Sequence, residues 1–476
     1  MTQKLAVHQT AIPGLLIIDL PVPADNRGWF KENWQRQKML ALGLPDFNPV
    51  QNNISFNSKV GSTRGIHAEP WDKYISVASG RIFAAWVDLR KGPSLGKTVS
   101  LELGPDRAVF VPRGVGNSYQ TLQENTAYTY LVNDHWSASS QENYSFLNLA
   151  DQHAAIDWPI PLDQAELSDK DQKHPFWPDI VPIDPAPLLV VGAEGQLGKE
   201  LVRQLSQQHI PYIACGRTEI DLAKPQDWLE AYRWSSLAGI INAGAYTAVD
   251  RAESSQGRSQ AWAVNAKGPA ALAALAQQAG IPLVQVSTDY VFDGSLPVGH
   301  YYTEQDNPAP LSVYGQSKAA GELGVSSLSK HYIVRTSWVI GAGKNFVATM
   351  SQLAQKSAEP AVVADQFGRP TFTEDLAAGI LHLLKSKAPY GTYHLTNSGD
   401  IISWAQLAQA VFTAHGLSPN KVKATSTAAY FAKTTVFAPR PKNSALDLTK
   451  IMATGFTPRD HRQALAAYLG VALPES

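Results

Sequence analysis

The feature that most restricts the fold is a glycine-rich turn between a buried strand and a helix, in the stretch LLVVGAEGQLGKELVRQL. Its glycines are Gly192, Gly195 and Gly198, which suit a tight turn, close approach of a pyrophosphate to the backbone, and packing of helix on strand. The spacing alone is a weak motif, but its place between a strand and a helix strengthens it. Phosphates would face the helix N-terminus at Gln196 and Leu197, so the sequence predicts a dinucleotide site.

Strand and helix patterns continue to alternate after this turn. The strand in GIINAG ends in the small residues Asn242, Ala243 and Gly244, which suit a chain segment that runs under a cofactor. A helical period in WAVNAKGPAALAALAQQAG then leads to the strand PLVQVSTDY. Such alternation predicts a doubly wound, Rossmann-type parallel sheet with α/β architecture.

The residues after the second strand of this sheet bear on the choice of cofactor. An acidic residue at the end of the strand PYIAC would indicate NADH, but Gly216 and Arg217 stand there instead. Arg217 could pair with a 2′-phosphate, which favours NADPH. Asp221 follows closely and could hold the adenosine side, so NADH stays possible.

A catalytic set is predicted in VSTDYVFDGSLPVGHYYTEQDNPAPLSVYGQSK. Tyr314 and Lys318 are four residues apart on a helix and therefore share one face. Thr288 ends the preceding strand, where an open α/β sheet places its chemistry. Beside a nicotinamide, these groups could reduce a ketone: Tyr314 protonates the alkoxide, Lys318 lowers the pKa of the phenol, and Thr288 orients the substrate oxygen. The Tyr–Lys spacing by itself occurs by chance, and the cofactor turn upstream and the STD at the end of the preceding strand give it weight.

Length and composition bound the remaining possibilities. A chain of 476 residues exceeds one ordinary domain, and 44% hydrophobic with 17% charged residues indicates a globular protein. A net charge of −1 argues against nucleic acid or an anionic membrane as partner. One cysteine, Cys215, fits a reducing compartment, and neither a signal peptide nor a membrane span is predicted. A cytoplasmic protein is expected.

The first part of the chain has a different pattern. Short strands separated by turn residues run from about residue 15 to 158, which predicts an all-β jelly roll. A proline-rich segment follows, and it reads as a semi-rigid spacer or as a strap along a domain surface, held by Phe176 and Trp177. We therefore expect a β domain over 1–184, with a linker at 159–184, and a reductase domain over 185–476.

Candidate residues of the β domain lie in RGIHAEPWDKY. His67 and Glu69 share a strand face and suggest a metal site, but a catalytic metal needs three protein ligands, and no matching third histidine lies nearby in sequence. No metal is therefore predicted. Arg64, His67 and Lys73 instead concentrate positive charge, which favours an anionic ligand such as a diphosphate.

The β domain resembles the cupin-type dTDP-4-dehydrorhamnose 3,5-epimerases. The resemblance is carried by DNRGWFKENW (25–34), QNNIS (51–55), residues 64–96, VPRGVGNSY (111–119), YTYLVND (128–134) and IDWP (156–159). It implies epimerisation beside a ketone without metal or cofactor. By this resemblance, His67 is the base, Asp151 orients it, Lys73 stabilises the enolate and Tyr130 is the acid. The implied diphosphate and nucleotide contacts are Arg27, Phe30, Glu32, Gln51, Asn53 and Arg64.

Five positions depart from this family's pattern. Asn117 stands where a histidine is usual, Ala68 replaces a tyrosine, His135 and Trp136 replace two tyrosines, and Leu149 replaces a tryptophan. These departures leave open whether one carbon or both are epimerised.

The second domain resembles dTDP-4-dehydrorhamnose reductase, an extended short-chain dehydrogenase/reductase. The matching segments are GAEGQLG, NAGAYTAVDRAE, VNAKGP, STDYVFDG, PLSVYGQSKAAGE, RTSWV, NFVATM, DQFGRPTFTEDLA, GTYHL and RPKNS. The resemblance implies the catalytic set Thr288, Tyr314 and Lys318, a small C-terminal substrate subdomain, and sugar-nucleotide contacts from Trp338 and Arg440. Ala445 departs from a usual arginine.

Together, the two resemblances predict a bifunctional enzyme. It would epimerise dTDP-4-dehydro-6-deoxy-D-glucose and reduce carbon 4 with NADPH to give dTDP-L-rhamnose. Two alternatives stay open: a reductase fused to a single-carbon epimerase that makes another deoxysugar, and a non-catalytic regulatory protein that binds a sugar nucleotide. The epimerase family further implies a homodimer in which Arg27 and Phe30 serve a neighbouring chain.

Overall fold

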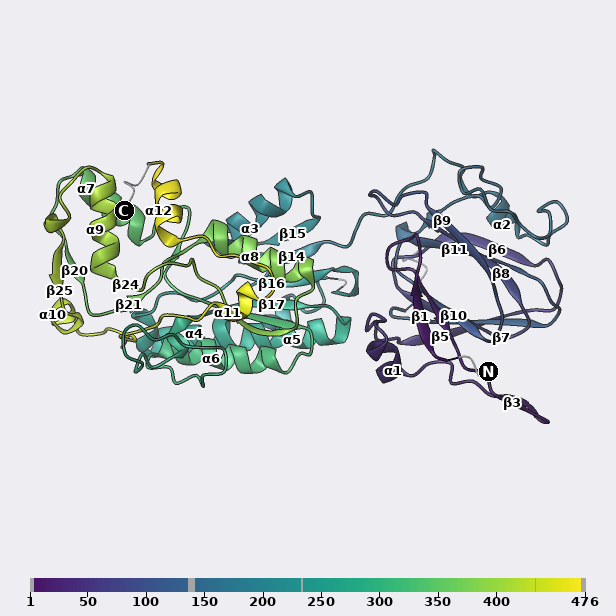
Figure 1. Cartoon of the computed structure of the whole chain (residues 1–476), viewed down its shortest axis with the longest axis horizontal. Coiled ribbons are helices and arrows are strands. Elements are labelled where there is room, and N and C mark those ends of the chain that lie inside the picture. Colours follow the sequence, from purple (N-terminus) through teal and green to yellow (C-terminus); the bar gives the residue numbers. More distant parts are fainter. Residues whose placement is uncertain (1–3, 136–141, 233, 433, 472–476) are drawn as a thin grey trace. The chain divides into compact units, whose positions relative to one another are not determined.

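The computed structural model describes residues 4–135, 142–232, 234–432 and 434–471 of the chain. It consists of two compact units, Met1–Ala186 and Pro187–Ser476 (Figure 1). The expected boundary after residue 184 lies close to this division. The N-terminal unit is built from antiparallel sheets and the C-terminal unit from a parallel sheet, as the predicted all-β and α/β classes require.

The N-terminal unit is a sandwich of two antiparallel sheets. In spatial order, the strands of the first sheet are β1 (Ala6–Gln9), β2 (Leu16–Asp19), β10 (Arg107–Val111), β7 (Lys73–Ser79), β12 (Thr126–Val132) and β5 (Gln51–Asn57). Those of the second are β13 (Ser145–Phe146), β6 (Thr63–Ala68), β11 (Val115–Thr121), β8 (Ile82–Asp88) and β9 (Thr98–Leu103). A hairpin of β3 (Ala24–Asp25) and β4 (Gly28–Trp29) and the helix α1 (Arg36–Ala41) lie outside these sheets.

Strand alternation explains where the core of this unit lies. Ile75 and Val77 of β7 are fully buried and pack with Trp86 of β8, so the main core lies between the two sheets. Tyr74 points to the opposite face of β7, where it packs with Met39 of α1. Successive strand residues point to opposite faces, so Lys73 shares the inner face with Ile75 and Val77.

The proline-rich segment packs on the N-terminal unit as a strap. Isolated bridges join Glu166 to Ser62 and Ile183 to Arg90. Trp177 packs against a buried cluster of this unit, whereas Phe176 is 50% exposed. Of the two interpretations of this segment, the surface strap is correct, and the strap also contains the one-turn helix α2 (Asp169–Gln172).

The C-terminal unit is organised around one parallel sheet. Its strands, in spatial order, are β15 (Tyr212–Cys215), β14 (Leu188–Val191), β16 (Gly239–Asn242), β17 (Leu283–Thr288), β18 (His331–Thr336) and β23 (Gly391–His394). The chain moves from β14 outward to β15 and then returns to the other side at β16. This reversal opens a crevice at the carboxyl ends of β14 and β16, where such sheets bind ligands.

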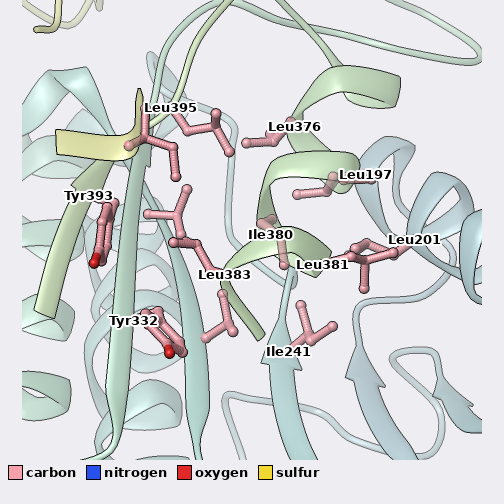
Figure 2. Close-up of a cluster of buried hydrophobic side chains, with 14 of the residues drawn as sticks. Leu197, Leu201, Ile241, Tyr332, Leu376, Ile380, Leu381, Leu383, Tyr393 and Leu395 are labelled. Carbon is pink, nitrogen blue, oxygen red and sulfur yellow. The ribbon is translucent and has the colours of Figure 1, made fainter. Parts of the chain in front are cut away.

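Helices cover both faces of the sheet (Figure 1). α3 (Gln196–Gln207) and α8 (Thr373–Ser386) lie on one face, and α5 (Gly268–Ala279) and α6 (Val313–Ser326) lie on the other. Figure 2 shows Leu197 and Leu201 of α3 against Leu376, Ile380 and neighbouring side chains of α8. Leu197 and Leu201 are four residues apart and therefore form one apolar stripe that packs on the sheet.

The remaining helices and short strands of this unit lie outside the parallel sheet. The helices are α4 (Ser255–Trp262), α7 (Phe346–Gln355), α9 (Trp404–Ala414), α10 (Thr427–Phe431), α11 (Thr449–Met452) and α12 (His461–Leu469). The short strands are β19 (Val339–Ile340), β20 (Ala361–Val363), β21 (Phe367–Gly368), β22 (Thr371–Phe372), β24 (Ile402–Ser403) and β25 (Lys423–Thr425). α7, α9 and α12 share a separate hydrophobic cluster that contains Trp338. No helix within the described residues is long and apolar enough to cross a membrane.

Candidate active sites

His67 of the N-terminal unit forms a hydrogen-bonded pair with Asp171. His67 lies on β6, and its Nε2 is 2.9 Å from Oδ1 of Asp171, which belongs to α2 in the strap. Asp171 is 5% exposed. Burial raises the pKa of Asp171, but the hydrogen bond and charge of His67 and the charge of His174 outweigh burial and lower it. An ionised Asp171 therefore holds a proton on Nε2 and leaves Nδ1 of His67 as the basic nitrogen.

The assignment of Asp151 as the partner of His67 is wrong. Oδ1 of Asp151 accepts hydrogen bonds from the backbone N–H groups of His153 and Ala154, and Oδ2 accepts one from Trp177 at 2.7 Å. Asp151 therefore fixes the start of one turn and anchors the strap at Trp177. The two carboxylates differ in role because the strap returns to β6 at Asp171.

A second histidine, His174, lies beside the pair. Its ring is 5.1 Å from that of His67 and stacks on Phe146 at 4.7 Å. Its Nδ1 is 3.1 Å from the carbonyl oxygen of Gly65. Burial lowers the pKa of His174, and the charge of His67 lowers it further, so His174 is neutral and donates from Nδ1.

Lys73 and Tyr130 meet on the inner face of the first sheet. Lys73 is buried, forms an ion pair with Glu69, and lies 5.4 Å from the centre of the Tyr130 ring. Burial and then the charge of Glu69 raise the pKa of Tyr130 to about 12, while Arg64 opposes this shift. Tyr130 is therefore protonated at neutral pH and able to serve as an acid.

The residues that depart from the family pattern have different surroundings. Asn117 lies opposite His67 in the β6–β11 ladder and donates to the Tyr128 hydroxyl at 3.0 Å. Ala68 and Leu149 are buried in one apolar cluster. Trp136 lies outside the described residues. Asn117 is thus the departure that faces the base directly.

The expected substrate contacts divide into two groups. Asn53 of β5 lies opposite Tyr130 in the ladder and accepts from Gln51, and Arg64 is on the same strand as His67. Arg27, in contrast, pairs with Asp25 on an exposed hairpin. The other two residues of this second group are Phe30, which is 71% exposed, and Glu32, which pairs with Lys38. Within the described residues, no hydrogen bond or ion pair joins this second group to His67.

A cavity of about 1010 Å³ opens at the crevice of the parallel sheet in the C-terminal unit. Gly192 and Gly244 face each other there so closely that a β-carbon on Gly192 would lie 2.6 Å from Gly244 Cα. α3 starts after Gly195, and no side chain caps its first N–H groups, so these are free for an anionic ligand. The geometry fits the pyrophosphate of a dinucleotide.

The remaining predicted cofactor residues lie in or just behind this cavity. Gln196, Leu197, Arg217, Asp221 and Ala243 line it, as do Tyr314 and Lys318. Asn242 is buried behind it, where its side chain donates to Gln285 and accepts from the Gly244 N–H. Gly198 permits close packing, since a β-carbon there would lie 2.1 Å from the Gly192 carbonyl oxygen. Arg217 is exposed and 3.7 Å from Asp221.

Thr288, Tyr314 and Lys318 line the same cavity. Burial raises the pKa of Tyr314 to about 12, and a hydrogen bond with Thr288 opposes this shift. Lys318 is 4% exposed, burial lowers its pKa to about 8, and it donates to the Val286 carbonyl at 2.6 Å. The expected lowering of the Tyr314 pKa by Lys318 is therefore absent in this structure, because the ammonium is directed to the backbone and burial dominates.

The two predicted sugar-nucleotide residues are placed differently. Trp338 lines the cavity and stacks on Trp404 with ring centres 3.7 Å apart. Arg440 forms an ion pair with Asp250 and lies over the Phe431 ring at 4.8 Å. Ala445, which replaces a usual arginine, is fully buried.

Sequence reasoning missed three residues at these sites. Asp171 and His174 lie in a segment that was interpreted as a linker, although Ser168 before them is a helix-capping residue that signals local order. The third residue is Asp289, whose carboxylate accepts a hydrogen bond of 3.0 Å from the hydroxyl of Thr288. Burial raises the pKa of Asp289 to about 7, a shift that only a tertiary environment reveals.

Comparisons with known proteins assign the two units to two families. The family described as RmlD substrate binding domain matches residues 186–473, and the family described as dTDP-4-dehydrorhamnose 3,5-epimerase matches residues 9–179. These ranges correspond to the two units of the structure.

Individual relatives agree with this division. A protein named RmlC homolog from Streptococcus pyogenes is 48% identical over 37% of this chain and 91% of that protein. A dTDP-4-dehydrorhamnose reductase from Streptomyces griseus is 40% identical over 58% of this chain and 90% of that protein. The crystal structure of a Bacillus anthracis dTDP-4-dehydrorhamnose reductase in complex with NADP is 36% identical, covers 60% of this chain and 98% of its own, and has a TM-score of 0.55.

Proposed function

The chain belongs to the RmlD substrate binding domain family by its C-terminal unit and to the dTDP-4-dehydrorhamnose 3,5-epimerase family by its N-terminal unit, and on this basis we propose that it synthesises dTDP-L-rhamnose. The N-terminal unit epimerises dTDP-4-dehydro-6-deoxy-D-glucose at carbons 3 and 5. The C-terminal unit then reduces the 4-keto group. The observation that carries this proposal is the presence, in one chain, of the His67–Asp171 pair and of the Thr288, Tyr314 and Lys318 set.

In the epimerase unit, the ketone at carbon 4 acidifies the protons on its two neighbouring carbons. His67 takes a proton at Nδ1, and the resulting imidazolium is stabilised by Asp171 at Nε2. Lys73 stabilises the enolate oxygen, and Tyr130 returns a proton from the opposite face. The raised pKa of Tyr130 keeps it in the protonated form that this step needs. This chemistry uses neither a metal nor a cofactor.

In the reductase unit, bound NADPH supplies the hydride for carbon 4. Tyr314 donates its hydroxyl proton to the alkoxide that forms, and Thr288 orients the substrate oxygen. Lys318 lies one helical turn from Tyr314, so a bound ribose could draw its ammonium away from the Val286 carbonyl and toward the phenol. Trp338 lines the cavity and also belongs to the hydrophobic cluster of α7, α9 and α12. We therefore assign this cluster to the substrate subdomain.

NADPH is the preferred reductant in this proposal. Arg217 lines the cavity, is exposed, and is only loosely held by Asp221 at 3.7 Å, so it is free to contact a 2′-phosphate. The solved NADP complex of the Bacillus anthracis reductase supports the same choice.

One experiment tests the whole proposal. The purified chain is given dTDP-4-dehydro-6-deoxyglucose and NADPH as sole reagents, NADPH oxidation is followed by absorbance, and the product is identified by NMR. Formation of dTDP-L-rhamnose is expected. NADPH oxidation that requires a separately added epimerase would show that the N-terminal unit is a binding module.

A single-carbon epimerase remains the second candidate, because Asn117 faces His67 where the family usually has a histidine. Reaction in deuterated water separates the two, since each epimerised carbon acquires one solvent deuteron. Two deuterons per product molecule are expected, and one deuteron would select the single-carbon reaction.

We also propose a homodimer formed through the N-terminal unit. The exposed apolar side chains Phe30, Ile54 and Phe56 lie on or beside the edge strand β5 and the β3–β4 hairpin. An unpaired, apolar strand edge favours association with another chain. In such a dimer, Arg27 and Phe30 of one chain would contact the substrate in the epimerase site of the other chain. Light scattering of the wild-type chain and of Phe56→Lys tests this, with a shift from dimer to monomer expected.

A further inference from the structure

The candidate epimerase base and two neighbouring side chains form a group that could bind a metal ion. A ring nitrogen of His67, a carboxylate oxygen of Asp171 and a ring nitrogen of His174 all lie within 4.8 Å of one another. Nε2 of His67 is 2.9 Å and Nε2 of His174 is 3.8 Å from the same oxygen, Oδ1 of Asp171. Asp171 and His174, neither of which sequence reasoning found, both come from the strap.

His174 is held with an unused lone pair directed at this group. Its side chain is 6% exposed, and Nε2 has no hydrogen-bond partner within the part of the chain that the structure describes. Nδ1 donates to the Gly65 carbonyl and Phe146 stacks on the ring, so both the tautomer and the orientation are fixed. A buried acceptor without a partner is costly, and a cation at this point would satisfy it.

The two distances to the Asp171 oxygen suit zinc. Zinc binds imidazole nitrogen at about 2.0–2.1 Å and carboxylate oxygen at about 2.0–2.2 Å, so tetrahedral ligand atoms are about 3.3 Å apart. The observed separations of 2.9 and 3.8 Å lie on either side of this value. Two imidazoles and one carboxylate form a donor set that zinc prefers. The His67 side chain is 32% exposed, which leaves an approach for the ion.

We propose that His67, Asp171 and His174 form a zinc site whose occupation stops epimerisation. This inference rests on the proposed role of His67 as the base. In the metal-free protein, Nε2 of His67 carries the proton toward Asp171, and Nδ1 is the free base. A zinc ion that binds Nε2 displaces the proton from this nitrogen. The proton of the neutral imidazole then resides on Nδ1. His67 keeps one proton throughout, but its remaining nitrogen no longer accepts one from the substrate.

The test begins with zinc binding, which does not depend on activity. Full-length protein freed of metal with a chelator is titrated with zinc chloride by calorimetry. His174→Asn retains an amide donor for the Gly65 carbonyl but removes Nε2, and His153→Asn removes an exposed histidine as a matched control. Wild type and His153→Asn should bind one more zinc ion per chain than His174→Asn. Equal stoichiometry in all three proteins would overturn the site.

The second measurement is solvent deuterium exchange into the keto sugar with and without zinc, each protein being compared with its own metal-free rate. Zinc should reduce exchange at least tenfold in wild type and His153→Asn, and less than twofold in His174→Asn. Zinc should not affect the reverse reductase reaction, the oxidation of dTDP-L-rhamnose by NADP, because this reaction does not use His67. Exchange that persists in zinc-saturated wild type would refute the inhibitory role. If metal-free protein shows no exchange at all, the proposed epimerase function fails, while calorimetry still decides the site.

Discussion

The Asp171→Asn variant tests whether Asp171, and not the strap-anchoring Asp151, is the carboxylate that serves His67. In the wild type, Oδ1 of Asp171 accepts from His67 Nε2 at 2.9 Å and leaves Nδ1 basic. The side-chain amide in the Asp171→Asn variant lacks the negative charge, and when its NH₂ donates to Nε2 it places the imidazole proton on Nδ1. Both effects act against proton abstraction, and the second reverses the tautomer that catalysis needs.

The size of the effect follows from the charge that forms on His67. Two unit charges about 4 Å apart interact by about 4 kcal/mol at an effective dielectric constant of 20. Since about 1.4 kcal/mol corresponds to a tenfold change in rate, Asp171→Asn should slow epimerisation by about a thousandfold. Partial exposure of His67 reduces this value, so a loss of about a hundredfold is the lower expectation.

The assay is the rate of solvent deuterium exchange into the keto sugar, normalised to folded protein measured by circular dichroism. Asp151→Asn is the matched control, because it makes the same chemical change in a carboxylate that caps backbone N–H groups. It should cost about 1–3 kcal/mol of stability and leave the rate of the folded fraction within about threefold. A rate above one tenth of wild type in Asp171→Asn would refute the reasoning. An equal loss in folded Asp151→Asn would refute it as well.

Three further predictions concern the C-terminal unit. Tyr314→Phe removes the proton donor, and it should slow NADPH oxidation by about 10²–10⁴-fold while deuterium exchange by the N-terminal unit continues; loss of both activities would contradict separate sites. Arg217→Ala should raise KM for NADPH about tenfold and leave KM for NADH unchanged in steady-state assays, and equal changes for both cofactors would rule out a contact with the 2′-phosphate. Burial lowers the pKa of Lys318 from 10.5 to about 8, so the unfolded chain binds more protons between these values and the wild type gains stability as pH rises through that range. Lys318→Met should abolish this rise and stabilise the unit at pH 7 by about 3 kcal/mol in urea unfolding, whereas an unchanged pH dependence would show that Lys318 is not desolvated.

Local sequence patterns predicted much of both units. The turn around Gly192 and the helical spacing of Tyr314 and Lys318 need only short-range geometry, and the structure places all three residues at one cavity. Short strands separated by turn residues likewise predicted the antiparallel β structure of the N-terminal unit. Such features depend on neighbours a few residues apart, for which backbone geometry fixes which side chains share a face.

The electrostatic state of the reductase residues was decided by tertiary structure. The sequence indicated that Lys318 would lower the pKa of Tyr314, but burial dominates both groups, and the ammonium is bonded to the Val286 carbonyl. Burial also gives Asp289 a pKa of about 7, which no local pattern signals. Desolvation depends on everything packed around a group, so residue type and spacing do not reveal it.

The sequence by itself indicated the strand-rich first part, the alternating strands and helices of the second part, and the cofactor turn. It also indicated His67 as the candidate base. Only the tertiary structure decided which carboxylate serves that base, because His67 and Asp171 are 104 residues apart in the chain. The resemblance assigned Asp151, but the path of the strap across β6 brings Asp171 to the imidazole and ties Asp151 to Trp177. Contacts between distant segments depend on how elements pack, and the same packing adds His174 to form a three-ligand group that no spacing rule contains.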